Sequence, residues 1–128
     1  MQNDPIPIEV DPSPNFIRDL RELSKSYRHI KSDLQPLIDQ LLQGETPGDR
    51  IKGIQSLAKP PGTGIVYKVR LKNSDVQKGK SGGYRVLYYL KSQDKIVLVA
   101  IYSKSDRTDI DAATIVAIIT QYENQFLN

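Results

Sequence analysis

Three cations alternate along one predicted strand of this 128-residue chain. Residues 65–72 change between apolar side chains and cations with a period of two, which is typical of a strand with one buried face. The outward row contains no anion and consists of Lys68, Arg70 and Lys72. Like charges on one face repel, so binding of a polyanion is the simplest reason for such a row. The alternative is a solvated edge strand that its cations protect from aggregation.

The cationic row lies in a segment that is basic throughout. Residues 59–107 contain eleven Lys and Arg against three Asp, hence +8, whereas the other residues contain seven against twelve acidic ones, hence −5. Five of the seven tyrosines fall in the same segment: Tyr67, Tyr84, Tyr88, Tyr89 and Tyr102. Cations interleaved with aromatic residues are typical of nucleic-acid binding, in particular of single-stranded RNA. The tyrosines can equally be core and strand residues.

Several common kinds of site lack the residues that they need. The chain has no cysteine, which excludes disulfides, thiolate zinc sites and a cysteine nucleophile. The single histidine, His29, has no carboxylate cluster near it in sequence, so we expect a surface or helix-packing residue. The basic segment contains only Asp75, Asp94 and Asp106, which leaves little material for hydrolysis by paired carboxylates. We therefore expect neither a metal nor a cofactor.

Lysine, arginine and tyrosine remain, and these residue types can cleave RNA without a metal. RNA carries its own nucleophile, the ribose 2′-OH, so the protein must orient it, neutralise the phosphorane and protonate the 5′-leaving oxygen. An arginine suits the second task because its guanidinium binds two phosphate oxygens at once. A lysine crowded by cations can become a general acid or base, and a tyrosine can stack on a base or act as a weak acid.

The loop 78–83, with the sequence KGKSGG, is similar to phosphate-binding loops only in composition. It lacks the GxxxxGK[ST] spacing and leads into a predicted strand, so we do not expect a nucleotide-binding loop. Its lysines, Lys78 and Lys80, and its backbone N–H groups can instead approach the phosphates of a bound polyanion. The alternative is a turn that needs glycine for positive φ.

The first third of the chain is predicted to be helical. Residues 1–12 contain three prolines and form either an irregular segment or a short edge strand. Ser13, followed by proline, is typical of a helix start, and apolar spacings of three and four then predict a helix over 14–34. Pro36 argues for a break at 32–33, after which a second helix follows. The two form either a helical hairpin or one kinked helix.

The remainder predicts three strands and a final helix. Strands at 65–72, 84–91 and 96–103 are joined by short links, which favours an antiparallel meander. The third strand is apolar at nearly every position, so we expect it to be central. A helix beginning near Asp109 or Asp111 places one apolar stripe on the sheet: Ile115, Ile118, Ile119, Tyr122 and Phe126. The fold class is therefore α+β, a small antiparallel sheet with an N-terminal helical hairpin and a C-terminal helix.

We expect a single domain that spans residues 1–128, because this length supports one ordinary hydrophobic core. No apolar run approaches the ~18 to 20 residues of a membrane span, and the polar start is unlike a signal peptide. A cytoplasmic protein without a membrane partner is the expected class.

Three segments resemble a known protein family. They are 67–71 (YKVRL), 79–89 (GKSGGYRVLYY) and 101–106 (IYSKSD). Together they resemble the RelE/ParE toxin superfamily, most closely the RelE/HigB-like branch of type II toxin–antitoxin systems, over roughly residues 14–126. The resemblance implies a microbial-RNase-like fold in a bacterial protein. It also implies a metal-independent endoribonuclease that cleaves mRNA in the ribosomal A site, inhibits translation and is held in check by a cognate antitoxin.

The resemblance implies roles for particular residues. Carried over by position, the catalytic set is Lys68, Arg70, Arg85, Lys104 and Tyr102. Arg85 would hold the scissile phosphate, and Lys104, helped by Arg107, matches the basic residue after the last strand. Tyr102 could instead be a core residue. The expected RNA-binding residues around this set are Lys72, Lys78, Lys80 and Arg107.

The chain also departs from the family pattern. After Asp109 there is no Lys, Arg or His, and the one tyrosine there, Tyr122, lies on the apolar stripe. Family members that use a C-terminal tyrosine or histidine therefore have no match, so the donor of the leaving-group proton is not identified. The superfamily also includes non-nuclease toxins that inhibit DNA gyrase, and a basic RNA-binding module without catalysis is a further alternative, since fold alone does not fix function.

Overall fold

A computed structural model describes residues 7–52, 54, 64–76, 83–106 and 109–126. Within these residues the elements are β1 (Glu9–Pro12), α1 (Pro14–Ser24), α2 (Ile30–Leu42), β2 (Asp49–Arg50), β3 (Ile65–Leu71), β4 (Tyr84–Ser92), β5 (Lys95–Ser103) and α3 (Ala112–Asn124). The α+β fold with an N-terminal helical hairpin and a C-terminal helix is confirmed. None of the helices in the described part of the chain combines the length and the apolar character needed to cross a membrane.

The strands form one mixed sheet in the order β1-β5-β4-β3-β2. The strands β3, β4 and β5 form the predicted antiparallel meander, and β5 lies between β4 and β1 with almost its whole length buried, as predicted for a central strand. One pair is parallel, because β1 returns to the sheet beside β5. The short strand β2, which was not predicted, pairs with β3 through Asp49 and Arg50.

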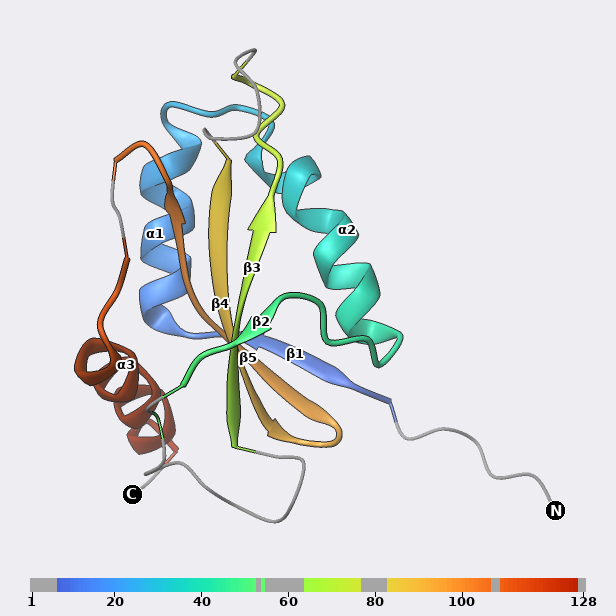
Figure 1. Ribbon diagram of the computed structural model, residues 1–128, viewed down its shortest axis with the longest axis vertical. Coiled ribbons are helices and arrows are strands. Elements are labelled where there is room, and N and C mark those ends of the chain that lie inside the picture. The colour runs from blue at the N-terminus through green and yellow to red at the C-terminus, as the bar shows by residue number, and fades with distance from the viewer. Residues whose placement is uncertain (1–6, 53, 55–63, 77–82, 107–108, 127–128) are drawn as a thin grey trace, which may run out of the picture.

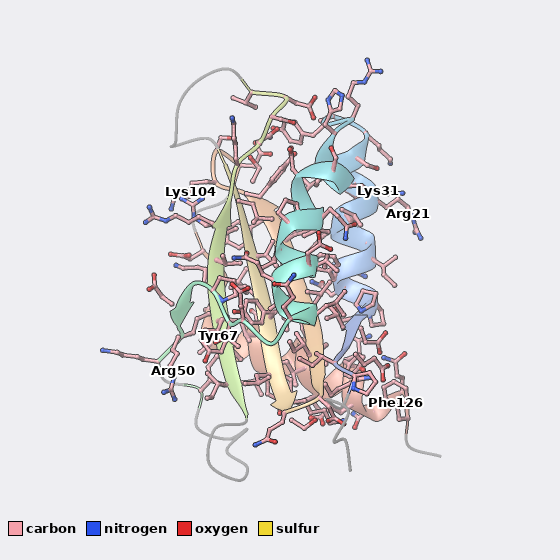
Figure 2. All side chains as sticks on the ribbon, turned by 90° about the vertical axis from the view of Figure 1, so that its right-hand side faces the viewer. Arg21, Lys31, Arg50, Tyr67, Lys104 and Phe126 are labelled. Carbon is pink, nitrogen blue, oxygen red and sulfur yellow. The ribbon has the colours of Figure 1, made fainter. Side chains whose placement is uncertain are left out.

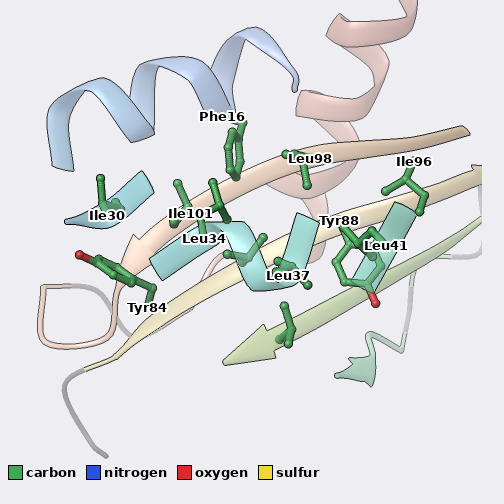
Figure 3. Close-up of a cluster of buried hydrophobic side chains, with 12 residues drawn as sticks. Phe16, Ile30, Leu34, Leu37, Leu41, Tyr84, Tyr88, Ile96, Leu98 and Ile101 are labelled. Carbon is green, nitrogen blue, oxygen red and sulfur yellow. The ribbon is translucent and has the colours of Figure 1, made fainter. Parts of the chain in front are cut away.

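Helices cover both faces of the sheet (Figure 1). The helices α1 and α2 pack on one face, where Phe16 and Leu37 belong to the larger hydrophobic cluster drawn in Figure 3. The helix α3 covers the other face, where Ile115 and Ile119 pack in a second cluster. Along β4 the side chains alternate between these clusters, which is the period-two pattern of a strand with two buried faces. The two faces are called the hairpin face and the α3 face below.

A β-bulge at Val99 changes which side chains of β5 reach the α3 face. Leu87 pairs with Ala100 and Tyr88 pairs with Leu98, so Val99 is the extra residue of the ladder. Val99 and Ala100 both belong to the cluster under α3, and the alternation is shifted from there onward. Tyr102 therefore lies on the α3 face, whereas uninterrupted alternation from Leu98 would place it on the hairpin face.

The Ser13 hydroxyl connects this bulge to the start of α1. Its Oγ accepts a hydrogen bond from the Phe16 backbone N–H at 3.0 Å, which caps the helix as predicted. The same Oγ donates to the Val99 carbonyl at 3.1 Å, and the Asn15 amide donates to that carbonyl at 3.1 Å. Ser13 is fully buried, so this one side chain satisfies a helix terminus and a bulge carbonyl that water does not reach.

The predicted break at 32–33 is wrong, because the hairpin turns several residues earlier and Pro36 lies inside α2. His29, in the turn, donates its backbone N–H to Asp75 Oδ2 at 2.9 Å, and its ring Nδ1 lies 2.6 Å from Asp75 Oδ1. This carboxylate follows β3 and is 46 residues away in sequence. A long-range contact therefore fixes the turn, and apolar burial along α2 offsets the hydrogen bond that Pro36 cannot make.

The start of α3 is confirmed at the second of the two predicted positions. The Asp111 side chain accepts a hydrogen bond from the Thr114 backbone N–H at 2.8 Å and caps the helix. The predicted apolar stripe holds except at its end, where Phe126 is 61% exposed and lies beyond the last helical residue. Its ring makes an edge contact with Tyr122 at 5.1 Å between centroids instead of entering the core.

Replacing Ser13 by alanine should destabilise the protein by about 1–3 kcal/mol, because the helix loses its cap and a buried carbonyl loses one donor. Ser24→Ala is the matched control, since the Ser24 hydroxyl is exposed at the other end of α1 and should change stability by less than about 0.5 kcal/mol. Urea denaturation measures both. Equal stabilities of the two variants would contradict the double role of Ser13.

Candidate nucleic-acid site

The meander brings the predicted site residues onto one face of the sheet. Arg70 on β3 pairs directly with Arg85 on β4, and Arg85 pairs with Tyr102 on β5, so the three form one row across the strands. Lys68 pairs with Leu87 in the next row on the same face. This is the face that α3 covers in part, as Leu87 and Tyr102 belong to its cluster. The juxtaposition of these side chains agrees with the sequence prediction.

Arg85 is the most unusual residue of this row. The residue is only 8% exposed, and its Nη1 donates to the carbonyl of Tyr84 at 3.2 Å. Directly opposed residues of an antiparallel pair have β-carbons about 4.5–5.5 Å apart, so Arg70 and Arg85 repel each other across the ladder. Among the described residues, neither arginine forms an ion pair with a carboxylate. Because a buried cation without an anion is costly, this row is suited to binding one.

Lys68 and Tyr102 are joined by a carboxylate that sequence reasoning missed. Asp109 Oδ1 accepts from Lys68 Nζ at 3.1 Å and from the Tyr102 hydroxyl at 3.0 Å. These two hydrogen bonds, that of Lys68 first, lower the pKa of Asp109 from its ordinary 3.8, and the charges of Lys68 and Lys104 act in the same direction. A lone aspartate seven residues after Tyr102 carries no sequence signal for this contact, and the sequence pattern predicts Asp109 only as a helix start.

Lys104 continues the site beyond the end of β5. Its backbone N–H donates to the carbonyl of Gly83 at 3.0 Å, which places Lys104 beside the start of β4. A β-carbon added at Gly83 would collide with the carbonyl of Leu71, so a close backbone approach is one reason for glycine at this position. Lys72 is exposed just after β3, next to this end of the sheet. The other three predicted RNA-binding residues lie outside the described part of the chain: Lys78, Lys80 and Arg107.

Most tyrosines of the basic segment are core residues. Tyr84, Tyr88 and Tyr89 are fully buried, and burial raises the pKa of each phenol. Tyr67 stacks on Tyr88 at 5.1 Å between centroids on the hairpin face, away from the cationic row. Tyr102 is a core residue, only 6% exposed, as one of the two interpretations predicted, and its hydroxyl reaches Asp109.

The residues needed for a metal site do not come together in the described part of the structure. No group of three His, Asp or Glu side chains there is placed to hold a metal ion. His29, the single histidine, lies in the turn before α2 and contacts Asp75, whose pKa it lowers. We therefore assign no residues to a metal.

The structure is that of a small α+β protein whose sheet carries a row of cations on the α3 face. The family model described as the RelE toxin of the RelE/RelB toxin–antitoxin system matches residues 55–125, more than half of the chain. The chain therefore belongs to the RelE family, within the RelE/ParE superfamily, and is a toxin of a toxin–antitoxin system. RelE toxins pair with antitoxins, so an antitoxin is its protein partner. No curated protein matched the chain.

Replacing Arg70 by glutamine should raise stability by a few tenths of a kcal/mol to about 1 kcal/mol at low salt, because it removes the repulsion across the ladder. The gain should shrink as added salt screens the two guanidinium groups. Lys72→Gln is the control, since Lys72 lies beyond the last paired residue of β3. Urea denaturation at two salt concentrations measures the effect. An Arg70→Gln variant no more stable than Lys72→Gln would contradict the proposed repulsion.

Proposed function

We propose that this toxin is a ribosome-dependent mRNA endonuclease that acts in the bacterial cytoplasm and stops translation by cutting mRNA in the A site. Membership of the RelE family supports a toxin of this kind. The observation that carries the proposal is the buried Arg85, which lies opposite a second arginine and forms no ion pair within the described residues. A phosphate of the RNA backbone supplies the anion that this arrangement lacks.

The reaction uses the RNA's own nucleophile. The 2′-oxygen attacks the adjacent phosphorus while the bond from phosphorus to the 5′-oxygen breaks, which leaves a 2′,3′-cyclic phosphate and a free 5′-OH. Negative charge grows on the non-bridging oxygens, where Arg70 and Arg85 stabilise it. Because the two arginines are fixed by the strand ladder, little reorganisation is needed when the charge develops.

The proton transfers need two further groups, because the 2′-OH must lose a proton and the 5′-oxygen must gain one. Lys68, in the neighbouring row, and Tyr102, at the end of the arginine row, are the polar groups that Asp109 holds together beside the two arginines. Lys104 adds a cation at the end of β5, where it compensates the charge of the bound phosphate. Lys72, Lys78, Lys80 and Arg107 steer the RNA toward the row and make binding dependent on salt.

The test is cleavage of mRNA on programmed ribosomes by purified protein. Arg85→Ala and Lys68→Ala should each lower the cleavage rate about 10²- to 10³-fold, because each removes one group that stabilises or protonates the reacting phosphate. Arg21→Ala is the matched control and should cleave like the wild type. Figure 2 shows Arg21 on the hairpin side of the sheet, opposite Lys104. Circular dichroism confirms that each variant is folded.

Other outcomes identify other functions. Full activity of both site variants would contradict the site assignment. Intact mRNA together with DNA damage after induction would indicate a gyrase-directed toxin of the same fold. Binding of RNA that weakens with salt but leaves the RNA uncut would indicate a binding module without catalysis.

A further inference from the structure

We infer that Asp109 is a positioning residue of the nuclease site, which holds Lys68 and Tyr102 on one carboxylate oxygen before RNA binds. The inference rests on the proposed function, since it assigns how two of its residues are oriented. Lys68 comes from β3 and Tyr102 from β5, so the carboxylate connects side chains from strands that β4 separates. Asp109 itself follows β5 and lies two residues before the Asp111 cap of α3, which anchors its backbone.

The two contacts restrict groups that would otherwise move. Lys68 Nζ lies 3.1 Å and the Tyr102 hydroxyl oxygen 3.0 Å from the same atom, Asp109 Oδ1. While both hydrogen bonds are formed, the ammonium and the phenol therefore stay close to each other. The Lys68 side chain is 36% exposed and carries a long flexible stem, which in isolation would sample many rotamers. Fixing it before the substrate arrives is what efficient proton transfer requires, since small misplacements at a reacting centre are costly.

Counting donors assigns different roles to the two groups. An ammonium has three donors, so Lys68 can give one to Asp109 and still direct two at a phosphate or a leaving oxygen. A phenol has one donor, and Tyr102 gives it to Asp109. The Tyr102 hydroxyl therefore has no proton left to give to the leaving oxygen. Asp109 thus leaves Lys68 as the donor of the leaving-group proton, the role for which the sequence offered no candidate after position 109.

Asp109 is poorly suited to be the general base itself. The hydrogen bonds from Lys68 and Tyr102 lower the pKa of this carboxyl, so it holds a proton weakly and stays ionised at neutral pH. An anion beside the phosphate also repels the substrate. A positioning role therefore makes an unusual prediction: removal of Asp109 should slow the reaction without weakening RNA binding.

Single-turnover cleavage on programmed ribosomes separates these effects. Asp109→Ala should lower the saturating rate about 10- to 100-fold while the half-saturating concentration stays equal or falls, since an anion has left a site for a polyanion. Asp109→Asn keeps an acceptor oxygen for both donors and should recover most of the rate. Asp106→Ala removes the same charge from the same segment, outside the contact with Lys68 and Tyr102, and should cleave like the wild type.

A wild-type saturating rate in Asp109→Ala would overturn the inference, whether or not RNA binding weakens. A wild type that leaves mRNA intact would overturn the proposed function instead, and an NMR titration then decides the contact alone. The NMR resonance of the Tyr102 ring carbon that bears the hydroxyl is assigned with the Tyr102→Phe variant. Its chemical shift should change as Asp109 protonates, with a midpoint pH below 3.8. This change should be absent in Asp109→Asn. Its absence in the wild type would also overturn the inference.

Discussion

The hydrogen bonds of the Ser13 hydroxyl are the constraint on which the site depends. Strand β5 must supply core residues to both faces of the sheet and must also deliver Tyr102 beside Arg85. Strict alternation cannot do both, because it would turn Tyr102 toward the hairpin face. The bulge at Val99 resolves the conflict, and its carbonyl is held by donors at the start of α1. The N-terminal helix thereby decides which side chains reach the site on the opposite face.

A second set of contacts fixes the position of α3 and of the segment before it. The Tyr122 hydroxyl donates to Asp11 Oδ2 at 2.6 Å, and Lys95 Nζ lies 2.6 Å from Glu9 Oε2 and 3.6 Å from Asp11 Oδ2. The hydrogen bond that Lys95 donates to Glu9 is the main reason that the pKa of Lys95 is raised, so this group stays charged. The parallel strand β1 therefore does more than extend the sheet: it joins the end of α3 to β5, while Asp111 caps the start. Asp109 lies just before this anchored helix.

The sequence determined the meander and its cationic row because both follow from local patterns. Period-two alternation in β3 and the basic residues of β4 and β5 are visible without any knowledge of tertiary contacts. Three features were not visible, and each depends on residues far apart in the chain. The turn before α2 depends on Asp75, the face of Tyr102 depends on the bulge, and the partner of Lys68 depends on how the segment after β5 returns to the sheet. The sequence also left open that Tyr102 is a core residue, and the residue is buried.

Protection of an edge strand explains only part of the cationic row. Strand β2 pairs with β3 only at Tyr67 and Lys68, and no strand in the described part of the chain pairs with that edge at Arg70, where a protective charge would be suitable. The explanation fails for Arg85, which lies on β4 between two paired strands and is 8% exposed. A cation there protects no edge and sits against a second arginine. Arg85 remains buried against this repulsion, and the described residues provide it with no carboxylate. The proposed binding of an external anion accounts for both arginines, whereas protection of an edge accounts for Arg70 alone.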